Sequence, residues 1–268
     1  MPYDGFDISG KQALVTGAGA NGGIGHAIAL GLARAGATLY LADIDEPGLN
    51  QTLCEIRDLG GDAQAMRCDI GNEAEVHALF QWLEQLGTKL DILVNVPFAF
   101  PSRARPHQLT YEDWQQTQQV SVTGYFLCCR SAIQQMLPYK SGCIINVGSN
   151  AGVTALGRGA MAYSCAKAAV HQMTRELAVE YAQDGIRVNA IVPAQTLTPG
   201  LKGHLERQEF KEKVLPRILS GIPMGRLLEA EEMVGPVLFL ASPAAAAITG
   251  ILLPVDGGNL ALNAGGGR

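Results

Sequence analysis

The sequence predicts an α/β protein with one Rossmann-type domain over residues 1–268: a doubly wound parallel sheet of seven strands with helices on both faces. Short apolar runs alternate with amphipathic stretches from residue 12 onward, which is typical of repeated βαβ units. A glycine-rich stretch follows the first apolar run and opens a helical pattern. No linker, repeat or charge block divides the chain of 268 residues.

The predicted strands are apolar runs of four to six residues bounded by turn residues. They cover residues 12–16, 38–42, 63–68, 91–94, 143–147, 187–192 and 251–255. Helical periodicity fits the stretches between them, at residues 23–35, 46–59, 73–86, 111–137, 160–183 and 229–240. A segment at about 196–221 follows the sixth strand and is expected to contribute to the substrate site.

Composition and charge exclude several classes of function. A net charge of −5 provides no basic surface for nucleic acid or an anionic membrane. The six cysteines form no C-x-x-C pair, so neither a metal site nor a disulfide framework is expected. Residues 234–255 carry no charge, but three prolines and two glycines divide them into a helix, a loop and a strand rather than a membrane span. The first residues lack an apolar signal segment, which predicts a cytoplasmic protein.

The glycine-rich stretch after the first strand predicts a dinucleotide site. Gly17, Gly19 and Gly22 satisfy G-x-G-x-x-G, while Gly17, Gly23 and Gly25 form a second possible set. Backbone amides and the positive end of the following helix converge there and suit a pyrophosphate. Two alternative interpretations are a flexible surface turn and, for the carboxylate that closes the second strand, a helix cap.

That carboxylate, Asp43, lies at the distance along the chain at which an acidic side chain binds the adenosine ribose hydroxyls. It would repel a 2′-phosphate, and Ile44, Asp45 and Glu46 add no basic residue to bind one. The sequence therefore predicts NAD rather than NADP as the cofactor.

Tyr163 and Lys167 are four residues apart in a helical pattern, so that both side chains project from one face. A lysine ammonium beside a tyrosine favours the phenolate, which can then act as a base near neutral pH. Ser149 follows the fifth strand, where ligands of open α/β sheets bind, and its hydroxyl could hold a substrate oxygen. By itself, however, a Tyr-x-x-x-Lys pair is more often an exposed pair on a helix than a site.

The chain resembles the short-chain dehydrogenase/reductase family over almost its whole length. The resemblance rests on seven ordered landmarks: residues 16–25, Asp69, 91–95, 144–149, Tyr163 with Lys167, 186–193 and 255–258. It implies that Tyr163 is the catalytic acid/base, that Lys167 lowers the pKa of Tyr163 and binds the nicotinamide ribose, and that Ser149 orients the substrate. It also implies a set of further cofactor contacts: Gly17, Asn21, Gly23 and Ile24 at the phosphates, Asp69 and Ile70 at the adenine, Asn95 near the cofactor through the fourth strand, and Pro193, Thr196 and Thr198 at the nicotinamide.

Three departures from the family pattern affect these expectations. The glycine-rich turn has five residues rather than three between Thr16-Gly17 and Gly23. Pro97 and Phe98 stand where small residues normally let the cofactor pass. Ser121 stands where the family has an Asn that supports a proton-relay water, so Ser121 either takes over that role or the relay is altered. A non-catalytic NAD-binding homologue is therefore one alternative to an enzyme.

The expected substrate is a secondary alcohol or ketone of the sugar, polyol or sugar-acid class. Residues 156–163 and 232–242 resemble the sugar-acid and polyol dehydrogenase branch, of which gluconate 5-dehydrogenase is typical. Arg103 and Arg158 are candidate contacts to a substrate carboxylate, although loop arginines usually meet only solvent. A 3-oxoacyl thioester reductase is the alternative enzyme. The long helices 111–137 and 160–183 carry apolar residues on more than one face, and the family resemblance implies a homotetramer.

Overall fold

The structure, a computed structural model, describes residues 4–262 and confirms the predicted fold class. Seven parallel strands form one sheet in the order β3-β2-β1-β4-β5-β6-β7. Each differs from its predicted bounds by no more than one residue at either end: β1 (Gln12–Thr16), β2 (Thr38–Asp43), β3 (Ala63–Arg67), β4 (Ile92–Asn95), β5 (Gly142–Val147), β6 (Ile186–Pro193) and β7 (Leu252–Val255).

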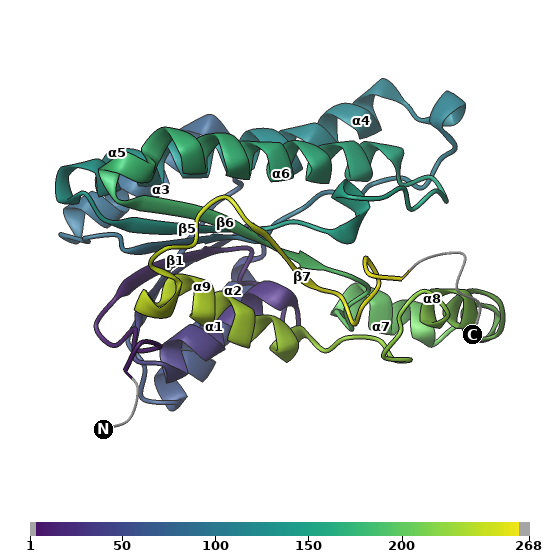
Figure 1. Ribbon diagram of the computed structural model, residues 1–268, viewed down its shortest axis with the longest axis horizontal. Helices are drawn as coiled ribbons and strands as arrows, with labels where there is room; N and C mark the ends of the chain where they lie inside the picture. The colour runs from purple at the N-terminus through teal and green to yellow at the C-terminus, as the bar shows by residue number, and fades with distance from the viewer. Residues whose placement is uncertain (1–3, 263–268) are drawn as a thin grey trace.

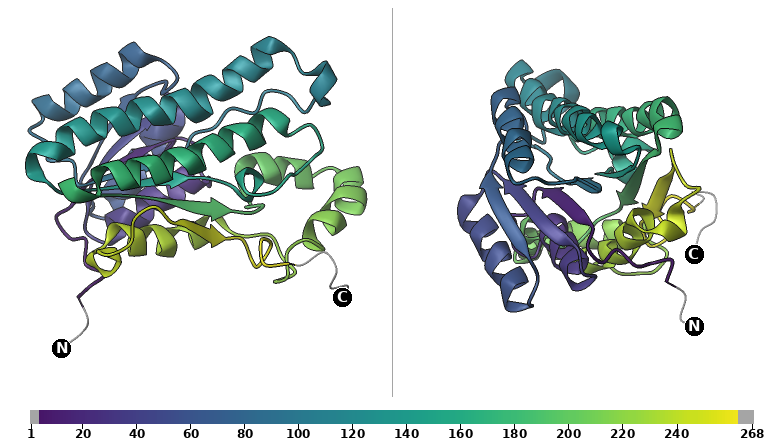
Figure 2. Two further views of the ribbon diagram at one scale, coloured as in Figure 1. Left: turned by 45° about the horizontal axis from the view of Figure 1, so that its top comes forward. Right: turned by 90° about the vertical axis from the view of Figure 1, so that its left-hand side faces the viewer.

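Helices cover both faces of the sheet, as Figure 1 and the end-on view in Figure 2 show. One face carries α1 (Ile24–Arg34), α2 (Glu46–Asp58) and α9 (Val234–Ala241). The other carries α3 (Glu73–Gln85), α4 (Tyr111–Gln118), α5 (Tyr125–Met136) and α6 (Met161–Tyr181). The short helices α7 (Pro199–Leu205) and α8 (Leu215–Leu219) follow the carboxyl end of β6.

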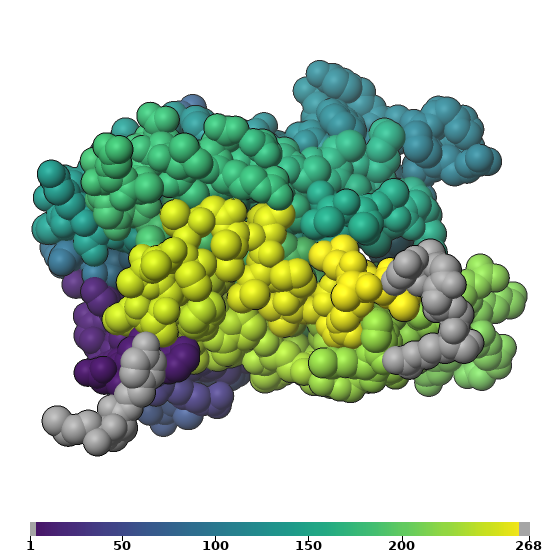
Figure 3. All heavy atoms as spheres, viewed as in Figure 1, coloured from purple at the N-terminus to yellow at the C-terminus, as the bar shows by residue number. Residues whose placement is uncertain are grey.

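Both faces of the sheet are buried, which explains why the strands appear in the sequence as continuous apolar runs. Val15 of β1 packs into the core beneath α1 with Ile28 and Leu32, whereas the neighbouring Leu14 packs into the opposite core with Tyr125. Successive side chains of a strand point to opposite faces, so both sets must be apolar when helices cover both sides. In the space-filling view of Figure 3 the yellow C-terminal part of the described chain lies across the middle of the visible face, and its strand β7 is an edge strand of the sheet.

The predicted helix 111–137 is interrupted. A π-helical segment, Gln119–Gly124, separates α4 from α5. Hydrophobic periodicity does not report such a break because the polar and apolar faces continue through it. A Cβ on Gly124 would lie 2.8 Å from the Ile70 side chain, so a glycine here lets α5 approach the segment after β3.

The uncharged stretch 234–255 divides as expected into α9, a loop with a 3₁₀ turn at Pro243–Ala245, and β7. Within residues 4–262 no helix is both long enough and apolar enough to cross a membrane.

The order of the strands locates the expected ligand crevice. The chain leaves β1 towards β2 and β3, and returns to the other side of β1 with β4. Ligands of such sheets bind outside the carboxyl ends of the strands where the order reverses. A cavity of about 620 Å³ lies there, bordered by residues that follow β1, β2, β4, β5 and β6.

Candidate active site

The glycine-rich turn forms one end of the cavity. Gly17, Gly23 and Gly25 line it, whereas Gly19 and Gly22 do not, so the second of the two predicted glycine sets faces the ligand space. Gly17 has a φ of +79°, and a Cβ on it would lie 3.0 Å from the Pro97 ring. A Cβ on Gly25 would overlap the Gly17 carbonyl. Glycine at these two positions therefore lets the turn, the start of α1 and Pro97 pack closely together.

Helix α1 begins at Ile24, which lines the cavity, and no side chain caps its first turn. The amide groups at this helix end are thus free of side-chain partners and point their dipoles at the ligand space. The glycine-rich turn and the uncapped helix end fit a pyrophosphate.

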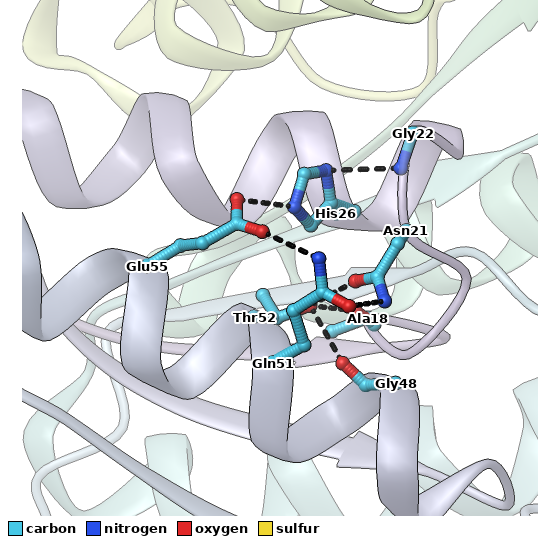
Figure 4. A network of polar contacts seen from close by, with 8 residues as sticks. All are labelled: Ala18, Asn21, Gly22, His26, Gly48, Gln51, Thr52 and Glu55. Carbon is cyan, nitrogen blue, oxygen red and sulfur yellow. Dashed lines mark hydrogen bonds and ion pairs between the residues drawn. The ribbon is translucent and has the colours of Figure 1, made fainter.

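The five-residue turn is held from outside the cavity by α2, as Figure 4 shows. Asn21 donates to Gln51 Oε1 (2.7 Å) and accepts from the Thr52 hydroxyl (3.3 Å), which is also 2.8 Å from the Ala18 carbonyl. Asn21 was predicted to bind the cofactor, but it is not among the cavity residues and its side chain is engaged with α2. Its side chain therefore stabilises the lengthened turn.

A second contact ties the same turn to the end of α1 (Figure 4). The Gly22 amide donates to His26 Nδ1 (3.3 Å), and His26 Nε2 lies 2.9 Å from Glu55 Oε2. Gln51 also donates to the Glu55 carboxylate (3.0 Å), and this bond, with the smaller contribution of His26, lowers the pKa of Glu55. Side chains on two helices, α1 and α2, therefore fix the turn.

Asp43 lines the cavity at the end of β2 and contacts the turn as well. Its Oδ2 accepts from the Gly19 amide (2.7 Å) and its Oδ1 from the Asp45 amide (2.9 Å). The cap of α2 is Asp45, not Asp43, which removes the capping interpretation of Asp43. Arg67 pairs with Asp43 in the sheet register, but its guanidinium contacts Glu75 (2.9 Å).

The residues predicted to surround the adenine lie beside Asp43. Asp69 and Ile70 both line the cavity, and the Asp69 carboxylate accepts from the Gly71 amide (2.8 Å). Asn95, by contrast, is fully buried and does not line the cavity. Its amide donates to Asn146 (3.0 Å), so that its side chain joins neighbouring strands rather than facing a ligand.

Ser149, Tyr163 and Lys167 meet at the other end of the cavity, and all three line it. Ser149 follows β5, and its backbone amide donates to Nε2 of His171 (3.3 Å). His171 lies on α6, one helical turn after Lys167. Because Nε2 accepts, the proton of His171 belongs on Nδ1. Burial, followed by the charge of Lys167, lowers the pKa of His171 to about 4, so this ring is neutral near pH 7. His171 was missed by the sequence reasoning, although its i+4 spacing from Lys167 indicates the same helix face.

Burial shifts the pKa values of both Tyr163 and Lys167. Desolvation raises the pKa of Tyr163, and the Ser149 hydroxyl opposes that effect. Lys167 is 1% exposed, and desolvation lowers its pKa to about 7. Burial therefore keeps the Tyr163 hydroxyl protonated at neutral pH. The lysine and a nicotinamide ring that carries positive charge would both favour its ionised form.

An aromatic cluster covers the Tyr163 ring. Phe100 stacks on it with ring centroids 5.3 Å apart, and Phe98 meets it edge-on at 5.6 Å. The Arg103 guanidinium lies 4.7 Å from the Phe100 centroid. Arg103 and the exposed Arg158 are not cavity residues, so the structure does not bring these two predicted carboxylate contacts into the site. Loop positions carry no periodicity from which their direction could have been predicted.

Ser121 lies in the π-helical segment and is fully buried. Its hydroxyl accepts from the Ala99 amide (3.1 Å) and is not part of the cavity lining. It therefore contacts the loop that carries Phe98 and Phe100. A role of Ser121 in a proton relay remains a prediction.

The remaining predicted residues follow β6. Pro193, Thr196 and Thr198 all line the cavity, and the Thr196 hydroxyl donates to the Ala194 carbonyl (3.1 Å). Gln116 of α4 lines it as well and was not predicted. Among residues 4–262 no group of three or more His, Cys, Asp or Glu side chains could hold a metal ion.

The chain is similar to known oxidoreductases over almost its whole length. Residues 17–259 match the family model described as enoyl-(acyl carrier protein) reductase, one of the short-chain dehydrogenase/reductase models. The chain is 35% identical over 254 residues to galactitol 2-dehydrogenase of Rhizobium johnstonii, covering 94% of this chain and 96% of that protein. It is 36% identical over 265 residues to the rhamnolipids biosynthesis 3-oxoacyl-[acyl-carrier-protein] reductase of Pseudomonas aeruginosa, covering 96% and 98%.

Solved structures agree with these sequence matches. A gluconate 5-dehydrogenase from Burkholderia cenocepacia, crystallised with NADP and tartrate, superposes with a TM-score of 0.89 at 30% identity, covering 97% of this chain and 99% of that one.

Proposed function

The chain belongs to the short-chain dehydrogenase/reductase family, and from this premise we propose that it interconverts a secondary alcohol and a ketone with NAD as its preferred cofactor. The observation that carries the proposal is that Ser149, Tyr163 and Lys167 line the same cavity as the glycine-rich turn and Asp43. A non-catalytic homologue would not need the three side chains together at one end of a dinucleotide-sized cavity.

Each of the three side chains has a distinct chemical task in this proposal. In alcohol oxidation the ionised Tyr163 accepts the proton of the substrate hydroxyl, and in ketone reduction its phenol returns it. The Lys167 ammonium stabilises the ionised form of Tyr163. The Ser149 hydroxyl donates to the substrate oxygen and holds it near Tyr163. When bound, the nicotinamide supplies the hydride acceptor or donor.

The preference for NAD is supported by the charges around the end of β2. The Asp43 carboxylate borders the cavity, and a 2′-phosphate beside it would be repelled. Arg67, its neighbour in the sheet, is paired with Glu75 and so is not free to neutralise such a phosphate. The gluconate 5-dehydrogenase crystallised with NADP makes the choice of cofactor a direct experimental question.

We propose a sugar, polyol or sugar acid as the substrate, and the cavity favours the uncharged members of this class. Gln116 and Ser149 offer polar groups for substrate hydroxyls, whereas neither Arg103 nor Arg158 lines the cavity. Similarity to galactitol 2-dehydrogenase supports a polyol. A specific observation favours a second candidate, a 3-oxoacyl thioester: Phe98, Ala99 and Val120 form an apolar wall that an acyl chain could follow.

The test is the change in NADH absorbance of purified protein with NAD and NADP in parallel. Neutral polyols, aldonic and uronic acids, and 3-oxoacyl thioesters form the substrate panel. NAD-dependent turnover of a polyol supports the proposal. Turnover confined to thioesters would replace the substrate class, and NADH binding without turnover of any panel substrate would favour the non-catalytic alternative.

We further propose that the protein is a homo-oligomer, with a tetramer as the expected state. The outer surfaces of α5 and α6 expose Phe126 (47%) and Val179 (81%), and a groove beside these helices is lined by Leu137 and Leu177. Exposed apolar surface of this kind often marks a contact between subunits. Light scattering coupled to size-exclusion chromatography tests the proposal, and a monomer at micromolar concentration would contradict it.

A further inference from the structure

We propose that Tyr125 is a positioning residue whose hydroxyl holds the ammonium group of Lys167 beside Tyr163. The inference rests on the proposed function, because it concerns the lysine on which the acid/base role of Tyr163 depends. Tyr125 does not line the cavity and so does not touch the substrate.

Three contacts form a closed triangle around the lysine. Lys167 Nζ donates to Tyr125 Oη (3.2 Å) and to the Val147 carbonyl (2.7 Å). The Tyr125 hydroxyl in turn donates to the same carbonyl (3.2 Å). Because the Tyr125 hydroxyl proton is donated to Val147, the oxygen lone pairs of Tyr125 are available to accept from Lys167. Nζ also lies 4.9 Å from the centroid of the Tyr125 ring, compared with 5.9 Å for the Tyr163 ring.

Because Tyr125 and Lys167 are buried, the hydrogen bonds of the lysine determine how readily it stays charged. Tyr125 is 0% exposed and Lys167 is 1% exposed, so little water is available to replace a lost acceptor. A buried ammonium needs acceptors to remain charged, and desolvation already lowers the pKa of Lys167 to about 7. At neutral pH, therefore, the fraction of charged lysine depends on the hydrogen bonds that it makes.

The titratable groups around Lys167 come from two helices. Tyr163 and His171 lie on its own helix, α6, while α5 contributes Tyr125 with Cys128 and Cys129 behind it. Burial raises the pKa of Tyr125 well above its usual value, and burial likewise raises the pKa of Cys129 to about 12. These groups stay neutral around pH 7. From strand β5, Val147 presents a backbone carbonyl rather than a charge.

The local backbone explains how a tyrosine reaches this point. The π-helical segment Gln119–Gly124 ends immediately before Tyr125, and its wider turn changes which side chains face α6. Ser121 is directed to the Ala99 amide, whereas Tyr125 reaches Lys167. The two side chains, four residues apart, thus serve different elements: Ser121 contacts the loop after β4, and Tyr125 contacts α6.

The test is Tyr125→Phe, which removes the hydroxyl and keeps the ring. The matched control is Tyr40→Phe. Tyr40 is a buried tyrosine of the same hydrophobic core whose hydroxyl donates to Gln12 Oε1 (3.1 Å), away from the site. If Tyr125 served only to fill the core, both variants would change thermal stability and neither would change the titration of Lys167.

The first measurement is the pKa of Lys167, read from the ¹³Cε shift of labelled lysine in the cofactor-free protein and assigned with Lys167→Met. We expect Tyr125→Phe to lower this pKa by about one unit, because hydrogen bonds to charged groups are worth that much. Tyr40→Phe should leave it unchanged. An unchanged titration in Tyr125→Phe would overturn the proposal, and this result does not depend on turnover.

The second measurement is the pH profile of kcat/KM for alcohol oxidation. Less charged lysine stabilises the ionised Tyr163 less, so the pKa of Tyr163 rises and the acid limb of the profile moves to higher pH. We expect kcat at pH 7 to fall about tenfold in Tyr125→Phe, with the KM for NAD nearly constant. A shifted lysine titration in a protein without turnover would support the role of Tyr125 and refute the proposed function, so that the two can fail separately.

Discussion

The two ends of the cavity are built in different ways. At the turn end, Asn21 and Asp43 hold the glycine-rich loop through hydrogen bonds to α2 and to backbone amides. At the other end, Phe98 and Phe100 extend from a segment without regular secondary structure and are held by ring contacts to Tyr163. A hydrogen-bonded turn fixes its ligand in one geometry, whereas an aromatic loop can be altered without disturbing the sheet.

This difference predicts where substitutions will act. Changes at the turn should weaken binding of the cofactor with any substrate. Changes at the aromatic loop should alter the choice of substrate and leave the cofactor unaffected. Tyr163, on which the aromatic loop packs, provides the reference against which both kinds of substitution are measured.

The largest effect is expected for Tyr163→Phe, which removes the proton donor and acceptor but keeps the ring stacked on Phe100. Turnover should fall by about 10²- to 10⁴-fold. NADH binding, followed by fluorescence titration, should be nearly unchanged because the turn is untouched. Tyr111→Phe is the control, since Tyr111 is 68% exposed on α4. Retained turnover in Tyr163→Phe would refute the assignment of the acid/base.

A pair of glycine substitutions tests the turn end directly. Gly25→Ala puts a methyl group onto the Gly17 carbonyl and should weaken NADH binding at least about tenfold, a loss of ~1.4 kcal/mol. Gly203→Ala in α7 meets nothing within 4 Å and should stabilise the fold by at most about 1 kcal/mol. Isothermal titration and thermal unfolding measure the two quantities.

The division between the ends would be wrong if Gly25→Ala bound NADH as tightly as the wild type. A folded Gly25→Ala protein, checked by circular dichroism, is needed before its affinity is interpreted. If Gly203→Ala weakened NADH binding as much as Gly25→Ala, the loss of affinity would not be specific to the turn end.

Asp43→Ala is expected to have a smaller effect, on the choice between cofactors. The ratio of kcat/KM for NAD to that for NADP should fall at least about fivefold, because unit charges 4 Å apart interact by ~1 kcal/mol even in water. Asp45→Ala is the control, since it removes a neighbouring carboxylate whose contact is the cap of α2. An unchanged ratio in Asp43→Ala would refute its role in selectivity.

The sequence predicted the sheet well, and the reason is physical. Strands buried on both faces must be apolar throughout, so their bounds are visible as composition. Ser149 and Lys167 could be predicted as neighbours in the cavity because a strand end and a helical i+4 spacing constrain where side chains lie. Regular secondary structure was therefore sufficient to predict the strands and the positions of Ser149 and Lys167.

The differences between prediction and structure occur where periodicity carries no information. Asn21 turns outward to α2, and Arg103 stacks on Phe100, because a side chain in a turn or loop points where its contacts direct it. In the π-helical segment the hydroxyl of Ser121 accepts from the Ala99 amide, and Tyr125, which follows the segment directly, contacts Lys167; the sequence predicted neither contact. A change from α- to π-helix alters which side chains face a neighbouring helix, and the apolar pattern of the sequence does not reveal it.

The smallest expected effect is that of Phe100→Ala at the substrate end. Removing the ring that stacks on Tyr163 should raise the substrate KM about two- to tenfold, since an aromatic pair is worth ~0.5–1.5 kcal/mol. The affinity for NADH should stay the same. Tyr139→Ala is the control, because Tyr139 is an exposed ring under Lys89 that does not line the cavity. A Phe100→Ala protein that lost NADH affinity at constant substrate KM would show that the two ends of the cavity are not independent.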